Sequence, residues 1–468
     1  MLEAGKRIAP PVPTVRTTGH GAGSLADRAA TPVDGASLAF VRIALGAIGV
    51  LTAGRIVAYG WIASLYAGPT HRFTYVGFGW VPQPTPAEAW MLVAVLAASS
   101  VAVALGWRTR PAVLVLLVVF AWIELIDVTT YLNHYWFVTL LATLCLAAPV
   151  GRAFSLDARG GRAAGPVALG WVWLLRFQVG VVYAFAGLAK LQADWFDGLP
   201  LRLWLPARAD LPLVGPLLDL PGTARVLAIA GALFDCTVVP LLLWGRSRPV
   251  AWVALVAFHV STWILFPIGV FPWLMIAVST VFFAPDWPRT LAARLAPSGS
   301  GLWTSRPSEM SRARNGGVRP RQRRVLALAA AVWIVVQLAL PLRHYAYPGD
   351  DSWTGQGYRF SWNVLLTERS GSATFLVTEP ATGRTRVADL DRLYTPNQLR
   401  VMVVEPDLLH QAARTIAAEE RARGHDVEVR VDAWVSLNGR PAERLVDPDV
   451  DLAAEPLDLW PDDWILRP

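Results

Sequence analysis

Long apolar segments constrain this chain more than any other feature of its sequence. A helix needs about 20 apolar residues to cross the ~30 Å hydrocarbon core of a bilayer. The composition suits such helices, because 54% of the residues are hydrophobic and only 16% are charged. We therefore predict a mostly α-helical, polytopic membrane bundle with nine transmembrane helices. They are expected at residues 38–58, 87–106, 111–130, 133–149, 165–190, 222–244, 249–266, 268–284 and 324–343.

The segments around these helices divide the chain into domains. Twenty lysines and arginines fall on one side of the membrane if the N-terminus is cytoplasmic, against four (Arg72, Arg202, Arg208, Arg225) on the other. The positive-inside rule therefore predicts a cytoplasmic N-terminus and an extracytoplasmic C-terminus. The predicted domains are a disordered cytoplasmic tail at 1–37, the helix bundle at 38–284, a basic cytoplasmic linker at 285–323, a last transmembrane helix at 324–343, and an extracytoplasmic α+β domain at 344–468.

The C-terminal part has the patterns of a small α+β domain. Residues 374–390 predict two strands around a glycine-containing turn, and residues 396–424 predict a helix that ends at Gly424. Residues 427–447 alternate in polarity and contain Asn438-Gly439, which favours a hairpin turn. No nucleophile elbow, phosphate loop or metal motif occurs there. The acidic run of Asp447, Asp449 and Asp451 is typical of a solvated loop, although it could also bind a cation.

Composition also excludes several classes of function. The two cysteines, Cys145 and Cys236, lie inside apolar segments, so we predict neither a disulfide framework nor a zinc site. The net charge of +7 comes mainly from arginines in short loops between apolar segments, so it does not indicate nucleic-acid binding. The sequence predicts no bound metal.

Lys190 is the most unusual residue of the apolar part. The chain has 42 lysines and arginines, but only Lys6 and Lys190 are lysines. Arginine stays protonated, whereas a desolvated lysine can lose its proton and act as a base. Lys190 ends a membrane-length apolar segment, and ionisable residues within membranes are often functional. The alternative is a structural lysine whose ammonium reaches the lipid headgroups.

Other polar residues are predicted to lie at a similar depth on the extracytoplasmic side. These are Glu124 and Asp127, Asn133 and His134, Asp194, and His259. Together they favour an outward-facing polar pocket walled by apolar helices, which would suit a lipid-soluble quinone. Each also has a structural alternative, since His134 could be interfacial and His259 a hydrogen-bonded core histidine. Arg176 and Asp235 lie deeper, and we expect them to form structural ion pairs, with each other or with Glu124.

Seven stretches resemble the vitamin K-dependent gamma-glutamyl carboxylase family, within the wider group that shares the horizontally transferred transmembrane domain. They run in the family's order and cover most of the chain from about 120 to 452. The AGxxKLxADW pattern around Lys190 and the Asn133-His134 pair are the most distinctive. The stretches are NHYWFVTLLATL (133–144), VVYAFAGLAKLQADWFDG (181–198), FHVSTWILFPIGVFPW (258–273), FFAPDWPR (282–289), LALPLRHY (338–345), SWTGQGYRFSWNVLL (352–366) and DAWVSLNGRPAERLVDPDVDL (432–452).

This resemblance implies a reaction and a set of site residues. Lys190 matches the general base that deprotonates reduced vitamin K, after which oxygen addition gives an alkoxide and then the quinone epoxide. The alkoxide removes a γ-proton from a substrate glutamate, and the carbanion captures carbon dioxide. His134 and Asn133 match residues that assist this chemistry. Tyr358 and Trp362 match the segment near the glutamate site, and the resemblance also assigns substrate binding to His259.

The resemblance further implies cofactors, partners and location. We expect a lipid-soluble quinol (phylloquinol or menaquinol), oxygen and carbon dioxide as co-substrates, and a glutamate-containing peptide or secreted protein as acceptor. A bacterial cytoplasmic membrane suits the preference for arginine. Gly357, Arg359 and Ile264 depart from the animal enzymes, which concerns glutamate and propeptide recognition more than quinol oxidation. Two alternatives are a quinol epoxidase with another substrate or uncoupled from carboxylation, and a non-catalytic membrane protein that binds quinone or lipid.

Overall fold

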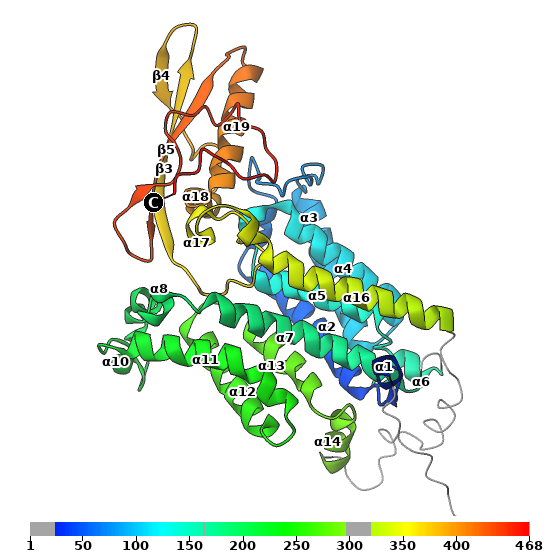
Figure 1. The fold of residues 1–468 in the computed structure, drawn as a ribbon. Helices are drawn as coiled ribbons and strands as arrows, with labels where there is room; N and C mark the ends of the chain where they lie inside the picture. The colour runs from blue at the N-terminus through cyan, green and yellow to red at the C-terminus, as the bar shows by residue number, and fades with distance from the viewer. Residues whose placement is uncertain (1–23, 162–163, 296–319, 468) are drawn as a thin grey trace, which may run out of the picture.

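The computed structural model describes residues 24–161, 164–295 and 320–467. Its helices form an elongated bundle, and a smaller domain of strands and helices stands on one end of that bundle (Figure 1). Seven helices in the described residues are long and apolar enough to cross a membrane. They are α2 (Ala36–Ala58), α3 (Pro86–Leu105), α4 (Thr109–Ile126), α7 (Leu169–Ala189), α11 (Thr223–Leu243), α12 (Arg248–Leu265) and α16 (Pro320–Leu342), which continues as a 3₁₀ turn at Arg343–Ala346.

The predicted count of nine spanning helices is therefore not confirmed. The segment at 133–149 forms α5 (Asn133–Ala147), whose 15 residues reach only about 22 Å at ~1.5 Å per residue. The segment at 268–284 forms α13 (Phe271–Ser279) and a 3₁₀ turn at Thr280–Phe282. Helix α13 starts late because Gly269 has φ +63° and is needed there, since a Cβ would collide with the Arg55 guanidinium. Both short helices pack among the long ones in the same core.

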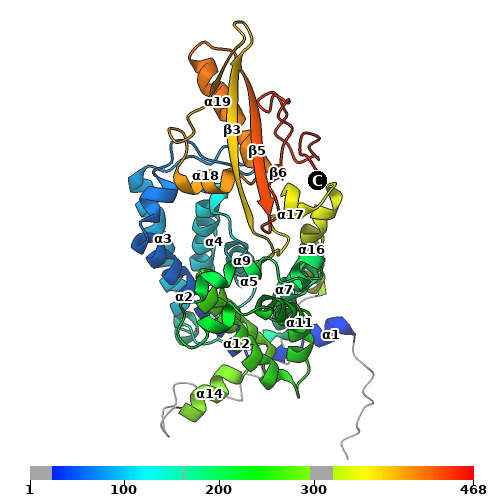
Figure 2. The ribbon, with the colours of Figure 1, turned by 90° about the vertical axis from the view of Figure 1, so that its left-hand side faces the viewer.

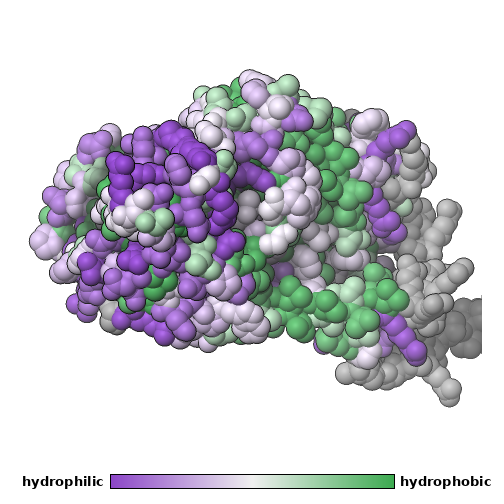
Figure 3. Space-filling model, turned by 90° about the horizontal axis from the view of Figure 1, so that it is seen from above, coloured by the Kyte–Doolittle hydropathy of each residue, from purple (hydrophilic) through white to green (hydrophobic). Residues whose placement is uncertain are grey.

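The outer surface of the long helices is apolar. Val226, Leu233 and Val335 are 66%, 60% and 64% exposed, although each belongs to a long apolar helix. Figure 3 shows the same contrast, with a largely hydrophilic C-terminal domain and hydrophobic helix sides. Exposure of so much apolar surface to water would be unfavourable, whereas contact of the same surface with the hydrocarbon of a bilayer would not be. The chain is thus built as an integral membrane protein.

Short elements close the end of the bundle that lies away from the C-terminal domain (Figure 1). They are α1 (Leu25–Ala29), β1 (Pro32–Val33) paired with β2 (Val167–Ala168), α6 (Leu156–Arg159) and α14 (Trp287–Leu295). We expected 1–37 to be a disordered tail, but residues 25–33 form α1 and β1. Residues 1–23 lie outside the described part of the chain. Within the predicted linker 285–323, the structure describes α14 and the first residues of α16.

The C-terminal domain is a four-stranded antiparallel sheet with helices against it (Figure 2). The strand order is β4-β3-β5-β6, and Phe375 of β3 lies opposite Val431 of β5. Both side chains are buried in a core that also contains Leu409 and Ile416 of the neighbouring helix. The predicted hairpins at 374–390 and 427–447 are both present. The strands are β3 (Arg369–Glu379), β4 (Arg384–Val387), β5 (Glu428–Leu437) and β6 (Glu443–Arg444).

The helix predicted at 396–424 is instead two helices, α18 (Pro396–Met402) and α19 (Pro406–Ala422). Pro406 explains the break, because the residue before a proline avoids the helical conformation. That residue, Glu405, is extended, with φ −121° and ψ 109°. The break turns α19 so that its apolar side covers the sheet.

Loops of the bundle reach into the C-terminal domain and fix its position. Phe73 and Val128 belong to the bundle's loops but are buried in the core of that domain. Asp127, 1% exposed, accepts hydrogen bonds from Gln398 Nε2 of α18 (2.7 Å) and from the Thr129 hydroxyl (2.7 Å). The two parts of the chain therefore share both an apolar and a polar interface.

We expect Asp127→Ala to weaken this interface. The substitution removes the buried acceptor of the Thr129 N–H and of one N–H of the Gln398 amide. We expect this loss to cost about 2 kcal/mol of stability. The C-terminal domain should detach from the bundle at a lower denaturant concentration, and limited proteolysis measures the midpoint of this transition. Asp219→Ala removes an exposed carboxylate and is the control. Equal midpoints for both variants would contradict this role of Asp127.

Candidate active site

Lys190 lies at the C-terminal end of α7 with its side chain turned into the protein. The residue is 5% exposed and caps the helix. Close packing of α11 on α7 depends on Gly187, since a Cβ there would lie 3.0 Å from the backbone nitrogen of Cys236. This close approach brings α11 residues next to the lysine. The inward direction of the ammonium differs from the headgroup-directed side chain of the structural alternative.

Asp235 of α11 is the ionic partner of Lys190. The Lys190 Nζ lies 2.9 Å from Asp235 Oδ2, and Asp235 is also 5% exposed. Nζ donates a further hydrogen bond to the carbonyl of Ala186 (3.2 Å) and lies 5.1 Å from the centre of the Trp195 ring. The ammonium is thus held by one carboxylate, one carbonyl and one aromatic face.

The expected pairing of Arg176 with Asp235 is wrong. Arg176 precedes Lys190 by fourteen residues on the same helix, which places it about 21 Å away along the axis. Its guanidinium donates instead to the carbonyls of Val281 (2.9 Å) and Phe283 (3.1 Å). It thereby caps the C-terminal end of the α13 segment.

A second polar pair lines the same cavity as Lys190 and Asp235. Tyr183 lies two turns before Lys190, so both side chains are on one face of α7. The Tyr183 hydroxyl is 2.7 Å from His259 Nε2 of α12, and His259 is 2% exposed. The other ring nitrogen of His259, Nδ1, is buried without a hydrogen-bond partner among the described residues. Such an orphaned group suits a ligand that could bond to it.

The cavity between these pairs has a volume of about 340 Å³ and is mostly apolar. We call it the Lys190 cavity. Its walls come from α7, α11, α12 and α13, and from Val364 and Leu365 of the C-terminal segment, which we call the closing segment. Apolar residues that line it include Val182, Leu201, Leu205, Phe234, Phe258, Leu265, Phe266, Phe271 and Met275. Only a few polar groups converge on this apolar space, as in sites for small lipophilic ligands.

Asn133 and His134 do not line this cavity, although they lie next to its wall. The His134 ring is 5.8 Å from the ring of Phe271, which in turn is 6.1 Å from the His259 ring. Phe271 therefore separates the two histidines. Asn133 Nδ2 donates to the carbonyl of Asn363 (3.0 Å), immediately before the two residues of the closing segment. Helix α5 is thus fastened to the closing segment.

Tyr358 and Trp362 belong to this same segment but also lie outside the cavity lining. The Tyr358 hydroxyl is 3.1 Å from the Thr367 hydroxyl, and burial raises the pKa of Tyr358 to about 12. Trp362 is fully buried, 6.2 Å from the ring of Phe137. Phe360, Trp362 and Leu365 all have positive φ values (66°, 62° and 53°). Such strained backbone often marks functional segments.

Sequence reasoning missed two residues of the Lys190 cavity, Asp235 as the partner of Lys190 and Tyr183 as the partner of His259. A signal existed for both. Asp235 is an acid within an apolar helix, which needs a cation, and Tyr183 is at heptad spacing from Lys190.

Asp194 of the ADW motif has a different role, since its carboxylate accepts from Asn438 Nδ2 (2.8 Å) and pairs with Arg440. It holds the hairpin of the C-terminal domain.

The acidic run near the C-terminus is a hydrogen-bonded loop. Asp447 accepts from the backbone N–H of Asp449 (2.9 Å), and Asp451 accepts from that of Val429 (2.8 Å). In the described residues, no group of three or more His, Cys, Asp or Glu side chains is arranged to hold a metal ion.

Comparison with known families assigns both parts of the chain. The family model of the HTTM domain matches residues 30–287, which is more than half of the chain. The model described as the lumenal domain of vitamin K-dependent gamma-carboxylase matches residues 322–468. No solved structure matches the chain.

Proposed function

This chain belongs to the vitamin K-dependent gamma-carboxylase family, and on that premise we propose that it is a quinol-dependent membrane carboxylase with Lys190 as its base. The observation that carries the proposal is the buried ion pair of Lys190 with Asp235 at the wall of an apolar cavity. The substrates would be a lipid-soluble quinol (phylloquinol or menaquinol), oxygen, carbon dioxide and a glutamate side chain.

The residues of the Lys190 cavity fit the head of a quinol. The ring would lie against Phe234, Phe258 and Phe271. One hydroxyl would contact Lys190, and the other would accept or donate at the orphaned Nδ1 of His259. Reduced vitamin K would supply, with oxygen, the strong base that takes a γ-proton from glutamate. The apolar lining would keep water away from that base.

The pairing of Lys190 with Asp235 would let the quinol lose a proton without an unpaired charge in the cavity. An ammonium cannot accept a proton, and the Lys190 Nζ lies 2.9 Å from the Asp235 carboxylate. In our proposal Lys190 passes one of its protons to Asp235 while it takes the proton of the quinol hydroxyl. The carboxylate becomes neutral, and the negative charge moves to the quinol oxygen. Lys190 remains the counterion throughout, so no unpaired charge forms in the apolar cavity.

The other predicted residues would position this chemistry rather than touch the hydroxyls. His134 supports Phe271, and Asn133 holds the closing segment through Asn363. Tyr358 and Trp362 would order the same segment beneath the C-terminal domain, where the glutamate peptide is proposed to approach. In the orientation that the loop charges favour, this domain is extracytoplasmic and the acceptor is a secreted protein or peptide.

The proposed function is tested with purified protein, reduced phylloquinone or menaquinol, oxygen, labelled bicarbonate and a glutamate-containing peptide. We expect quinone epoxide, detected by mass, together with label in the peptide. Epoxide without label would replace carboxylation by quinol oxidation that is uncoupled or serves another substrate. Absence of epoxide from folded protein with either quinol would overturn the proposal in favour of a quinone- or lipid-binding protein.

A further inference from the structure

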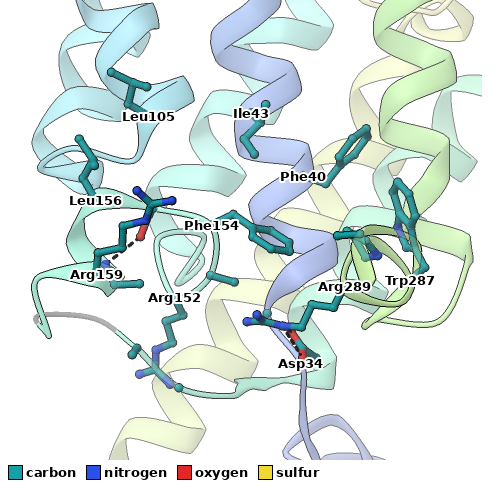
Figure 4. A pocket seen from close by; sticks show the side chains of 18 of the residues that line it. Asp34, Phe40, Ile43, Leu105, Arg152, Phe154, Leu156, Arg159, Trp287 and Arg289 are labelled. Carbon is teal, nitrogen blue, oxygen red and sulfur yellow. Dashed lines mark hydrogen bonds and ion pairs between the residues drawn. The ribbon is translucent and has the colours of Figure 1, made fainter. Parts of the chain in front are cut away.

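Figure 4 shows a second cavity, of about 660 Å³. Its lining residues from α6 and α14 place it at the end of the bundle away from the C-terminal domain (Figure 1). It is bounded by the start of α2, the end of α3, residues 152–159 with the short helix α6, residues 164–166, and α14. We call it the basic-end cavity. No residue assigned to the proposed reaction lines it, so it calls for a separate explanation.

One part of the basic-end cavity is apolar. Phe40 and Ile43 line it from the first turns of α2, and Leu105 lines it from the last turn of α3. Leu291 and Leu295 line it from α14. Leu105 and Leu295 are 53% and 76% exposed, which is unfavourable in water and favourable against an acyl chain.

The other part is cationic. Among the described residues, three arginines (Arg152, Arg159, Arg289) line the cavity, against a single carboxylate, Asp34. Asp34 is engaged by Arg289 at 2.8 Å. Arg152 donates one N–H to the carbonyl of Pro166. The Arg159 side chain is exposed and has no hydrogen bond or ion pair within the described ranges. Two guanidinium groups therefore retain donors for an anion.

A fully buried arginine behind the cavity adds to its positive potential. Arg42 is 0% exposed and donates to the carbonyls of Val103 (2.6 Å), Ala104 (2.9 Å) and Phe154 (2.6 Å). Ala104 and Phe154 are lining residues of the cavity. The hydrogen-bond partners of this guanidinium are thus carbonyl dipoles, and the Asp157 carboxylate attracts it without a direct hydrogen bond.

Helix α14 has the composition of a helix that lies in a membrane interface. Its sequence WPRTLAARL places Trp287, Leu291 and Leu295 at helical spacing, with Arg289 and Arg294 beside them. Amphipathic helices with aromatic and leucine residues on one side and arginine on the other bind at the headgroup level. The cavity therefore opens where headgroups and acyl chains meet.

We propose that the basic-end cavity binds one phospholipid with an anionic headgroup from the leaflet at that end of the bundle. Arg152 and Arg159 hold the phosphate, and an acyl chain lies along Ile43, Leu105 and Leu295. Apolar walls beside cationic groups match the two ends of such a lipid. A solvated basic loop would need the arginines but would not need the apolar cavity. This site goes beyond the proposed function and does not depend on it.

The full chain is placed in nanodiscs of equal parts phosphatidylcholine and phosphatidylglycerol, and the lipids that stay bound on release are identified by native mass spectrometry. We expect wild type to retain phosphatidylglycerol. The pair Arg152→Gln and Arg159→Gln should lower this retention about tenfold or more, because each arginine near an anionic lipid contributes about fivefold. Leu105→Trp should lower it by filling the space for the acyl chain.

The control pair is Arg110→Gln with Arg246→Gln, which removes the same charge from exposed positions outside the cavity, one in the first turn of α4 and one in the loop after α11. Equal retention by both pairs would overturn the proposal. Inorganic phosphate separates a lipid from a soluble anion. If phosphate raises the melting temperature of the wild type in phosphatidylcholine nanodiscs as much as phosphatidylglycerol does, the site binds a soluble anion and the lipid proposal fails.

Discussion

Lys190→Ala is expected to reduce quinone epoxide formation by about 10²- to 10⁴-fold, the usual contribution of a general base. The alanine removes the amine that lines the cavity and lies 2.9 Å from the Asp235 carboxylate. Lys190→Arg should fail as well, because a guanidinium cannot give up its proton to Asp235. Epoxide is measured by mass under saturating quinol, and kcat is expected to fall rather than KM to rise.

The loss must be separated from misfolding. Lys190→Ala leaves Asp235 buried without its cation, which is destabilising unless the carboxyl is protonated. The thermal transition and the amount of quinone retained during purification are therefore measured for each variant together with its rate. Arg225→Gln removes an exposed cation from the same end of the bundle and should keep the wild-type rate. Epoxide formation by folded Lys190→Ala within tenfold of wild type would refute Lys190 as the base.

Features that depend on local sequence were predictable. Seven of the expected apolar segments form helices of spanning length, because backbone hydrogen bonds in hydrocarbon must be satisfied within the segment itself. The hairpin at Asn438-Gly439 follows from local turn chemistry, with φ values of 53° and 75° at these residues. The break before Pro406 could also have been predicted, since proline restricts the residue before it. We predicted one continuous helix there because the apolar residues on both sides of Pro406 keep a helical spacing.

Features that depend on how helices pack were not predictable from the sequence. Asp235 is 45 residues from Lys190, and their contact requires the close approach of α11 to α7 at Gly187. Arg176 was expected to pair with Asp235 because sequence alone does not give the depth of each residue. The predicted polar pocket likewise divides in the structure, since Phe271 stands between His134 and His259. Lys190 and His259 share the cavity, whereas Asn133 and His134 support its wall.

Asp235→Asn is expected to lower epoxide formation about 10²-fold or more, with the fold and quinone retention preserved. Asparagine has nearly the same shape and can still accept a hydrogen bond from Lys190, but it cannot take up the transferred proton. Asp235→Glu keeps the acceptor in a slightly displaced position and should recover part of the rate. Rates are compared at saturating quinol, so that a loss in kcat reports proton transfer rather than binding.

This substitution distinguishes two ways in which Lys190 could work. If Lys190 acts alone as a neutral amine, removal of the Asp235 charge would favour that neutral form, because an unpaired ammonium is costly in an apolar cavity. Asp235→Asn would then keep or raise the rate. If the proton passes through Lys190 to Asp235, the rate falls, because asparagine offers no carboxylate to receive it. A rate within threefold of wild type would exclude the relay and leave Lys190 as the sole base.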